Sequence, residues 1–318
     1  MEHIFIINPV SGTANAETLL VPQIKKAAEE LNVPYKIIKT QYAGHAREIA
    51  KKLAESGKEL RLYACGGDGT LNEVVEGSLG FQNIETGCVP CGSGNDFVRN
   101  FGTKDDFLNI KDLIQGKSCV IDLIKTQHGI ATSICSAGLD ALVAYGIPKF
   151  RRIPFAGGET AYKLSILTSL CTKLGHRLHI EADGEIFEGE YLMIAVCNGM
   201  TYGGGFKAAP CADMQDGLLD LVLVKKISRL KIAGVVNTYK QGNHIKGGEV
   251  IPSLKNLVTY RRVKNVSVQV MDNHPIVINQ DGECAKRMSL KATTERKAVR
   301  VILPRSIYMR SKLIKETV

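Results

Sequence analysis

The sequence predicts an α/β protein of two domains: an N-terminal doubly wound, Rossmann-like parallel sheet and a C-terminal, mostly antiparallel β-sandwich with added helices. In roughly the first third of the chain, short apolar runs alternate with helical patterns, as they do in repeated βα units. From about Val120 the strand-like runs become longer and alternate apolar with polar residues, which is typical of antiparallel strands. The chain has 318 residues, enough to build two sizeable cores.

The expected elements of the first domain follow one another as βα units. Leu20, Ile24 and Leu31 recur at helical spacing and indicate that one helical face is buried. Strands are expected over His3–Val10, Tyr35–Thr40, Leu60–Ala64 and Ile84–Pro90, and helices over Ala16–Leu31, His45–Leu53 and Thr70–Glu76, with a short helix after Gly94.

The expected elements of the second domain are mainly paired strands. Leu178, Ile180 and Ala182 alternate with polar residues, and an Asp183-Gly184 turn follows them, which is typical of an antiparallel hairpin. Further strands are expected over Ile186–Val196, Leu219–Val224, 266–270 and Ala298–Leu303, and helices over 158–174 and 228–241. We therefore expect one domain over residues 1–125, with 305–318 returning to it, and a β-rich domain over 126–304.

The charge balance favours an anionic partner. With 41 Lys and Arg against 32 Asp and Glu, the formal net charge is +9, which suits a nucleotide, a nucleic acid or an acidic membrane surface. Aromatic residues make up only 6% of the chain and tryptophan is absent, so the stacking platforms of a nucleic-acid binder are missing. We expect no nucleic-acid partner.

Cysteines and apolar runs bear on the compartment. The chain has nine cysteines at irregular spacing, which does not resemble a disulfide framework and indicates reduced thiols in the cytosol. Cys88 and Cys91 form a C-x-x-C pair, for which buried side chains, a metal site and redox chemistry are alternatives; we favour buried side chains. No secretory signal and no apolar run of membrane-spanning length is visible, so a cytoplasmic protein with at most peripheral membrane contact is expected.

The stretch from Gly66 to Thr70 is the most informative part of the chain. It reads Gly66-Gly67-Asp68-Gly69-Thr70, between an apolar strand and a helical pattern. Such a turn delivers backbone N–H groups to an anion at a helix N-terminus, and glycines let a polyphosphate approach closely. An acid in the turn can reach a bound Mg²⁺ or a hydroxyl. The alternative is an ordinary βα turn.

Two further loops follow predicted parallel strands. The first is Asn8-Pro9-Val10-Ser11-Gly12, and the second runs from Gly92 through Ser93 and Asn95 to Asp96. Both belong at the carboxyl edge of the sheet, where α/β proteins bind ligands. Neither has the G-x-G-x-x-G pattern or a P-loop lysine. Turn formation and helix capping are the alternatives for these residues.

The second domain offers two acidic loops. Asp213 and Asp216 are three positions apart and can face one hard cation with help from a backbone carbonyl. Asp281, Gly282 and Glu283 follow an apolar strand. A plain turn before the next strand is the alternative for both loops, because Asp-Gly is a strong hairpin pattern.

Taken together, these loops resemble the diacylglycerol kinase catalytic-domain family, which includes soluble bacterial lipid kinases and is related to sphingosine kinases. The resemblance spans nearly the whole chain, in the order of the family's motifs. It is carried by Asn8-Pro9-x-Ser11-Gly12, Thr40 with Gly44-His45-Ala46, Gly66-Gly67-Asp68-Gly69-Thr70 with Asn72-Glu73, Pro90-x-Gly92-Ser93-Gly94-Asn95-Asp96-Phe97, Gly138-x-Asp140-Ala141, Pro210-x-Ala212, Asp216-Gly217-Leu218-Leu219-Asp220 and Asp281-Gly282-Glu283.

The resemblance implies a nucleotide-binding first domain and a lipid-substrate second domain, with ATP in the cleft between them. The implied nucleotide-binding residues are Asn8, Pro9, Ser11, Gly12, Thr40, Gly66, Gly67, Asp68, Gly69, Thr70, Glu73, Gly92, Ser93, Asn95 and Asp96. Asp68 and Asp96 would position catalytic Mg²⁺ through water. Ser93 stands where the family often has threonine.

The resemblance also implies the catalytic and metal residues. It gives Asp281 as the general base, with Glu283 in the same motif, whereas the position of Asp68 has that role in sphingosine kinases. Asp213, Asp216 and the carbonyl of Leu218 resemble a structural Mg²⁺ site. Cys211 and Gln215 stand where acids are frequent in the family, so this loop departs from its usual form.

The expected function is therefore that of an ATP- and Mg²⁺-dependent lipid kinase, with diacylglycerol as the first candidate and phosphatidic acid as its product. A kinase of another lipid such as a sphingoid base, an NAD-kinase-like enzyme and a non-catalytic ATP or lipid sensor are the alternatives. We expect a lipid alcohol at the inner face of a membrane as the partner. Basic patches at Lys149–Arg152 and Lys225–Lys231 can contact anionic lipid, but for both patches we favour the alternative of a solvated face. The resemblance suggests a homodimer.

Overall fold

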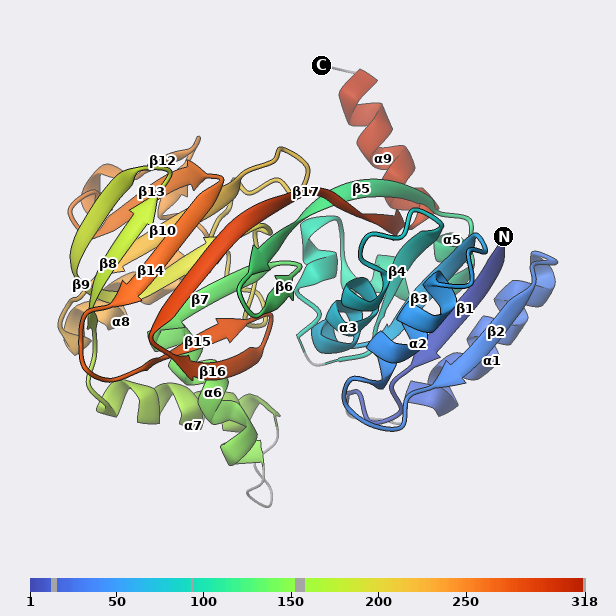
Figure 1. The fold of residues 1–318 in the computed structure, drawn as a ribbon, viewed down its shortest axis with the longest axis horizontal. Coiled ribbons are helices and arrows are strands. Elements are labelled where there is room, and N and C mark those ends of the chain that lie inside the picture. The colour runs from blue at the N-terminus through green and yellow to red at the C-terminus, as the bar shows by residue number, and fades with distance from the viewer. Residues whose placement is uncertain (13–15, 93, 152–157, 317–318) are drawn as a thin grey trace. The chain divides into compact units, whose positions relative to one another are not determined.

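The chain folds into two compact units, each of which has its own core. The computed structural model describes residues 1–12, 16–92, 94–151 and 158–316 (Figure 1). Unit 1 comprises Met1–Asp122 and Arg296–Val318, and unit 2 comprises Leu123–Glu295. Strands β5 (Lys117–Thr126) and β17 (Ser289–Leu303) belong to both units. The boundaries expected from the sequence, 125/126 and 304/305, lie inside β5 and just after β17.

Unit 1 is built on a parallel sheet in the order β2-β1-β3-β4-β17. Its strands are β1 (Glu2–Ile7), β2 (Tyr35–Lys39), β3 (Leu60–Gly66) and β4 (Ile84–Pro90), joined by the last part of β17. Its helices are α1 (Ala16–Glu30), α2 (His45–Ala54), α3 (Asp68–Ser78), α4 (Lys104–Leu108), α5 (Ile110–Ile114) and α9 (Arg305–Glu316), with a 3₁₀ turn at Phe97–Asn100.

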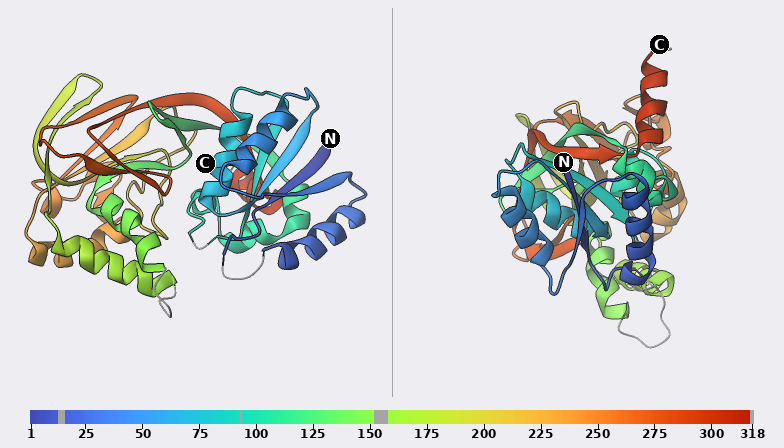
Figure 2. Two further views of the ribbon diagram at one scale, coloured as in Figure 1. Left: turned by 60° about the horizontal axis from the view of Figure 1, so that its bottom comes forward. Right: turned by 90° about the vertical axis from the view of Figure 1, so that its right-hand side faces the viewer.

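Helices cover both faces of this sheet. The chain moves from β1 outward to β2 and then back across the sheet to β3 and β4, so right-handed connections place α1 on one face and α2 with α3 on the other. Figure 2 shows these two groups on opposite sides of the strands. Because neither face meets water, residues Ile4 to Ile7 are all buried, which explains the unbroken apolar run of β1. The doubly wound sheet expected from the sequence is confirmed.

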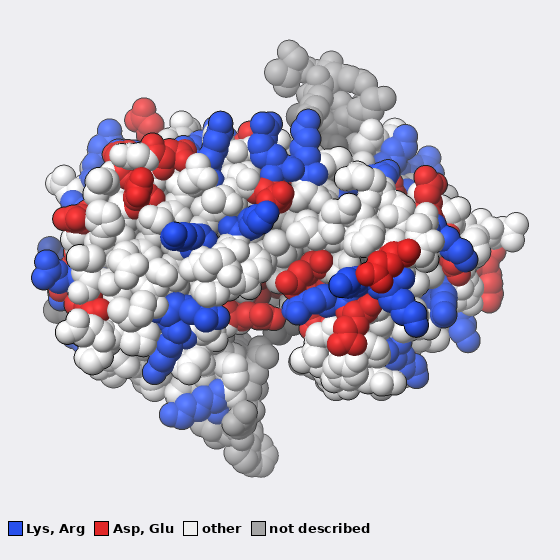
Figure 3. Space-filling model, in the orientation of Figure 1, with Lys and Arg blue, Asp and Glu red and all other residues white. Residues whose placement is uncertain are grey.

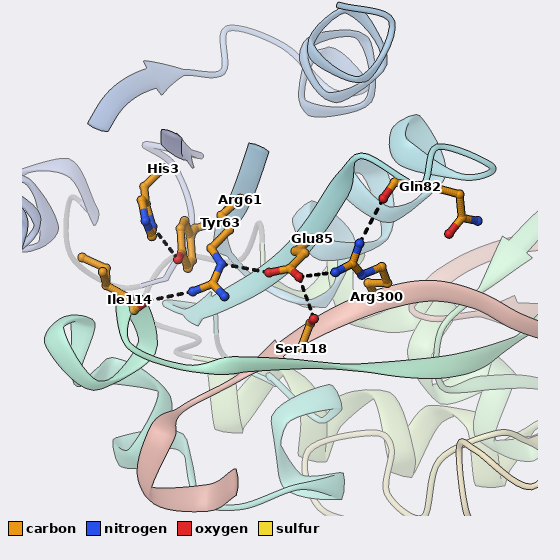
Figure 4. A network of polar contacts seen from close by, with 8 residues as sticks. All are labelled: His3, Arg61, Tyr63, Gln82, Glu85, Ile114, Ser118 and Arg300. Atoms are coloured by element: carbon orange, nitrogen blue, oxygen red, sulfur yellow. Dashed lines mark hydrogen bonds and ion pairs between the residues drawn. The ribbon is translucent and has the colours of Figure 1, made fainter. Parts of the chain in front are cut away.

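A buried polar network ties β17 into the sheet (Figure 4). The Glu85 carboxylate on β4 accepts bonds from Arg61 Nε at 2.9 Å and Ser118 Oγ at 2.7 Å, and pairs with Arg300 on β17. Two cations and a hydroxyl thereby satisfy a carboxylate that has almost no contact with water. Beside this network, His3 Nδ1 lies 2.8 Å from the Tyr63 hydroxyl.

Unit 2 is mainly antiparallel, in the order β16-β15-β7-β9-β8-β14-β17, with β10 pairing to both β9 and β13. Its strands are β6 (Gly129–Ala131), β7 (Ile134–Gly138), β8 (His176–Ala182), β9 (Glu185–Cys197), β10 (Leu219–Lys225), β11 (Ile245–Lys246), β12 (Glu249–Val250), β13 (Val258–Val263), β14 (Asn265–Val270), β15 (Ile276–Gln280) and β16 (Glu283–Arg287). Its helices are α6 (Leu139–Arg151), α7 (Gly158–Cys171) and α8 (Arg229–Lys240), with a 3₁₀ turn at Pro252–Leu254.

Strand β9 shows how unit 2 builds two cores from one sheet. Ile194 and Val196 belong to one core, which also contains Val266 of β14. Ala195 and Cys197 point to the other face of the strand and belong to a second core, which also contains Ile232 of α8. Side chains alternate across a strand, so its second half must be apolar at every position. The antiparallel β-sandwich expected from the sequence is confirmed.

Two details differ from the expected elements. The first strand ends at Ile7 rather than Val10, because Asn8 and Pro9 form a turn in which Ser11 N donates to the Asn8 carbonyl. Helix α6 follows directly after β7 and was not expected, because Gly146 and Pro148 interrupt its helical pattern. Within the residues that the structure describes, no helix is both long and apolar enough to cross a bilayer.

Candidate functional site

Four loops of unit 1 follow β1, β2, β3 and β4, the parallel strands of its sheet. They begin at Asn8, Thr40, Gly67 and Cys91. Parallel strands end at the same edge, so these loops gather there, where α/β sheets bind ligands. The Thr40 amide donates to the Ile7 carbonyl at 2.9 Å, which places Thr40 beside the start of the first loop.

The first loop contacts its neighbours through the side chain of Asn8 and through the backbone of Gly12. Asn8 Nδ2 donates to Thr70 Oγ1 at 3.2 Å, which joins the first loop to the start of α3. Gly12 has a φ of +86°, and a Cβ there would lie 2.3 Å from the Cys91 carbonyl oxygen. Only glycine allows this contact, so the local packing requires a glycine at position 12.

The third and fourth loops touch through their backbones. A Cβ on Gly92 would lie 2.5 Å from the Cα of Gly67, so any side chain would push the two loops apart. Gly69 is different: it is exposed, and among the residues that the structure describes no heavy atom would lie within 4 Å of a Cβ there. The first amides of α3 have no partner inside the helix. The open surface over Gly69 therefore offers an anion direct access to a helix N-terminus.

Asp68 connects the third loop to the fourth. Its carboxylate accepts hydrogen bonds from the amides of Asp96 at 3.1 Å and Phe97 at 3.2 Å. Asn95 has a left-handed φ of +54° and its side chain bonds back to Gly92, with Oδ1 accepting from the Gly92 amide at 3.1 Å. The structure thus brings Asp68, Asn95 and Asp96 together. Ser93 lies outside the described residues.

Glu73 has a role that local sequence did not reveal. Its two carboxylate oxygens accept from the amides of Gly44 at 2.9 Å and Ala46 at 3.1 Å, at the start of α2. The N-cap residue Gly44 has no side chain to satisfy these amides, and Glu73 supplies the missing acceptor from the neighbouring helix. The side chain therefore anchors α2 next to the Thr40 loop.

The C-x-x-C pair is packed into the edge of the sheet. Cys88 is buried and Cys91 is half-buried. Burial raises the pKa of the Cys91 thiol to about 11 and that of Cys88 well above its usual range, so both stay protonated and unreactive at neutral pH. Within the described residues, no group of three or more His, Cys, Asp or Glu side chains is arranged to hold a metal ion.

In unit 2, Asp281 occupies a tight hairpin turn between β15 and β16. Gln280 and Glu283 pair across the turn, and both Asp281 and Gly282 have left-handed φ values, +45° and +95°. A two-residue turn of this kind matches the twist of the flanking strands. Glu283, the first residue of β16, is exposed.

The Asp281 side chain turns inward to a nest of donors between β6 and β7. Oδ1 accepts from the amides of Ser133 at 3.1 Å and Ile134 at 2.9 Å, and Oδ2 accepts from Thr132 Oγ1 at 2.8 Å and from the Thr132 amide. Four donors around one carboxylate fix its position in the turn. These donors could not be predicted from the sequence, because they lie almost 150 positions before Asp281 and two of the three residues contribute only backbone groups.

The loop before β10 presents hard oxygen donors on two carboxylates, and one of these carboxylates is already ion-paired. Asp213 Oδ1 accepts from the Gln215 amide at 3.0 Å, and Asp216 Oδ1 accepts from the Leu218 amide at 2.9 Å. The other Asp216 oxygen is ion-paired with Arg262. Asp220 is buried close by, and burial raises the pKa of its carboxyl to about 6, with a further contribution from the charges of Asp216 and Asp213.

Two family models match the chain and together cover most of it. The model of the diacylglycerol kinase catalytic domain matches residues 2–126, and that of the YegS C-terminal NAD kinase beta sandwich-like domain matches residues 133–303. The chain belongs to the diacylglycerol kinase catalytic-domain family. This membership agrees with the resemblance stated from the loops.

Relatives of this diacylglycerol kinase family match along almost their full length. A protein named diacylglycerol kinase from Bacillus subtilis (strain 168) is 29% identical over 303 residues, covering 94% of this chain and 95% of its own. One of the same name from Staphylococcus carnosus (strain TM300) is 27% identical, covering 95% of each chain. A crystal structure of a diacylglycerol kinase from Bacillus anthracis str. Sterne shares the fold, with a TM-score of 0.68 at 18% identity, covering 96% of this chain and 98% of that one.

Proposed function

We propose that this protein is a lipid kinase that transfers the γ-phosphate of ATP to the hydroxyl of a lipid alcohol, with diacylglycerol as the first candidate. The observation that carries the proposal is the edge of the unit 1 sheet, where four loops meet around an open helix N-terminus in a chain of this family. An exposed helix start lined by glycine suits a polyphosphate.

We assign ATP to this edge. Gly69 and the first amides of α3 would receive phosphate oxygens, because no heavy atom of the described residues lies within 4 Å of the position of a Cβ on Gly69. Asn8, Asp68 and Asn95 are already tied into the loop framework and would hold its shape. The remaining residues proposed to surround the nucleotide are Pro9, Ser11, Gly12, Thr40, Gly66, Gly67, Thr70, Glu73, Gly92, Ser93 and Asp96.

The proposed chemistry is a direct phosphoryl transfer. The lipid hydroxyl oxygen forms a bond to the γ-phosphorus while the bond to the β,γ-bridging oxygen breaks, so the products are a phosphorylated lipid and ADP. The hydroxyl proton passes to a carboxylate, for which we propose Asp281, with Glu283 beside it in the same turn. Asp68 is the alternative acceptor. To accept a proton, Asp281 must give up a hydrogen bond from Thr132 or its neighbours.

Bound Mg²⁺ would neutralise charge on the transferring phosphate. Asp68 and Asp96 fit that requirement, since they are adjacent carboxylates at the same edge. Asp213 and Asp216, with the Leu218 carbonyl, offer oxygen donors of the type that Mg²⁺ prefers. Arg262 already supplies a cation to Asp216, so metal binding there must displace a guanidinium or share the carboxylate with it.

A screen of substrates tests the proposal. Purified protein is incubated with γ-³²P-ATP, Mg²⁺ and a panel of lipid alcohols in mixed micelles, namely diacylglycerol, monoacylglycerol, sphingosine, ceramide and undecaprenol. Label in one lipid identifies the substrate, and we expect phosphatidic acid. Labelled NADP in a parallel reaction with NAD would favour the soluble-substrate alternative, and ATP binding without any transfer would favour a sensor.

We also propose that the protein reaches its lipid from the membrane surface, because a two-chain lipid leaves a bilayer only at a cost of about 0.8 kcal/mol per exposed methylene. The basic run near α8 is partly engaged in the fold: Lys226 pairs with Glu190 at 3.0 Å, and Arg229 donates to the Leu170 carbonyl at 2.7 Å. Leu230, beside them, is 89% exposed. On the face drawn in Figure 3, basic and acidic side chains are interspersed.

Vesicle binding across a salt series tests this surface docking. If charge drives it, binding to anionic vesicles weakens as the salt concentration rises, and neutral vesicles bind less at low salt. Binding that depends on neither salt nor anionic lipid would contradict electrostatic docking and leave exposed apolar residues such as Leu230 to explain it.

A further inference from the structure

Asp140 is a buried carboxyl group that the proposed function does not use. It stands in the first turn of α6, directly after β7, and both of its oxygens are buried. Among the residues that the structure describes, none satisfies hydrogen-bond geometry with either oxygen. An unpaired buried carboxylate is costly, and burial raises the pKa of Asp140 to about 6. A buried carboxyl group with this energetic cost suggests a functional role for Asp140.

The groups around Asp140 come from five helices and strands and from the loop that contains Tyr202. Ser136 on β7 and Tyr202 favour its charged form, as do the amides at the start of α6. Cys197 at the end of β9, Cys284 on β16 and Tyr239 on α8 interact with its charge. Burial raises the pKa of each of these thiols and phenols, so they are neutral near pH 6. Asp140 is the member of this group that titrates there.

A chain of hydrogen bonds leads from the Asp281 turn toward this carboxyl. The Gly282 amide donates to Asn279 Oδ1 at 2.8 Å, which fixes the orientation of the Asn279 amide. Asn279 Nδ2 then donates to Ser136 Oγ at 3.3 Å. Because this bond uses a lone pair of Ser136, its hydroxyl proton is available for an acceptor. Asp140 is the acceptor beside it.

We propose that Asp140 is a positioning residue for the hairpin turn that carries Asp281 and Glu283, acting through Ser136 and Asn279. Two bonds of this relay are present in the structure, from Gly282 N–H to Asn279 and from Asn279 to Ser136. The third, from the Ser136 hydroxyl to Asp140, is the proposed step, and Ser136 is among the groups that favour the charged form of Asp140. The turn is then held at two points: by the Asp281 carboxylate in its nest and by Asn279 on the opposite side. The inference rests on the proposed function only for its effect on catalysis.

The relay requires ionised Asp140, because a protonated carboxyl is a weaker acceptor for the Ser136 hydroxyl. As the pH falls through about 6, Asp140 takes up a proton and the turn should loosen. Amide exchange in residues 279–284 should therefore accelerate below about pH 6, and kcat should fall over the same range.

The test compares Asp140→Asn and Ser136→Ala with a matched control, Ser165→Ala. Ser165 is also fully buried and donates to the Val143 carbonyl of α6 at 2.6 Å, but it lies off the relay. In both relay variants we expect faster amide exchange over residues 279–284 and a kcat about tenfold lower at unchanged KM for ATP. Because the two residues act as one chain, the double variant should resemble each single variant. Asp140→Asn should also lose the decline of kcat near pH 6.

Ser136→Ala decides the matter even if Asp140→Asn does not fold. If Ser136→Ala has the same rate of amide exchange over residues 279–284 and the same kcat as Ser165→Ala, the proposal is overturned and Asp140 is a structural residue only. Additive effects in the double variant would also overturn it, because two independent contacts are not a relay. Failure of the proposed function is recognised separately: the wild-type protein would then phosphorylate no lipid alcohol, while the exchange experiment still tests the relay.

Discussion

At the scale of single residues, glycines at the edge of the unit 1 sheet differ in what surrounds them. Gly12 and Gly92 are required by the fold, because a Cβ at either would collide with the backbone of another loop. Gly69 has free space around it. Packing against described residues therefore does not explain a glycine at position 69, and the proposed phosphate site does.

Gly69→Ala should therefore separate binding from folding. We expect the free energy of unfolding to change by no more than about 0.5 kcal/mol, because the new methyl group meets no protein atom. ATP binding, measured by calorimetry, should weaken at least about tenfold as the methyl group obstructs the phosphates. Gly234→Ala in α8, which also meets nothing within 4 Å, is the control and should bind ATP normally. Unchanged ATP affinity in Gly69→Ala would remove this loop from the binding site.

Asp281→Asn should affect both stability and turnover. An amide in place of the carboxylate turns an NH₂ group toward backbone donors, which should cost about 2 kcal/mol of unfolding free energy. As the proposed base, Asp281 should also supply at least about a hundredfold in kcat.

Asp183→Asn is the matched control for that substitution. Asp183 also begins an Asp-Gly turn with a left-handed φ, and it accepts from the amides of Lys264 at 2.7 Å and Asn265 at 2.9 Å. We expect it to lose similar stability, measured by urea denaturation, but to keep kcat. Equal kcat values in the two variants would show that Asp281 is structural and point to Asp68 as the proton acceptor.

His3 should make the protein sensitive to acid. Burial, with help from the charge of Arg61, lowers the pKa of His3 to about 4, so the folded protein resists protonation there while the unfolded chain takes up a proton near pH 6.5. The contribution of His3 is therefore present above about pH 6.5 and is lost progressively as the pH falls toward 4. His3→Gln should flatten this part of the stability curve, measured by urea denaturation at a series of pH values. An unchanged slope would show that other groups cause it.

At the scale of elements, the strands and most helices of unit 1 could be predicted because each buries one continuous face. The apolar periodicity and the glycine turns predicted most of the ends of β1, β3, α2 and α3 to within about two residues. Helix α6 could not be predicted, because Gly146 and Pro148 break the local pattern and tertiary packing overrides them. The loop residues of the candidate site were predictable in type and order, but not their contacts.

The α2–α3 pair illustrates such a contact. Glu73→Ala should remove the acceptor for two amides at the start of α2 and lower the free energy of unfolding by about 1 kcal/mol. Glu76→Ala is the control, because Glu76 joins the same two helices through a half-exposed ion pair with Arg47 and caps no amide in the described part of the chain. Its loss should cost less than about 0.5 kcal/mol. Equal losses of unfolding free energy, measured in guanidinium, would contradict the capping role of Glu73.

At the scale of the whole molecule, each unit carries one part of the proposed reaction. Unit 1 offers the open helix start for a nucleotide, and unit 2 offers the acidic turn at Asp281. The sequence predicted both parts, because glycine loops and Asp-Gly turns are local patterns. It could not predict that Asp281 is held by Thr132 and its neighbours, because such long-range contacts leave no periodic pattern.

The most direct measurement compares kcat/KM for diacylglycerol and for NAD with the same preparation, ATP and Mg²⁺. We expect rapid formation of phosphatidic acid, a loss of that activity when Mg²⁺ is chelated, and no NADP above background. Phosphorylation of NAD in preference to every lipid alcohol, or no phosphoryl transfer to either, would contradict the proposed lipid kinase activity.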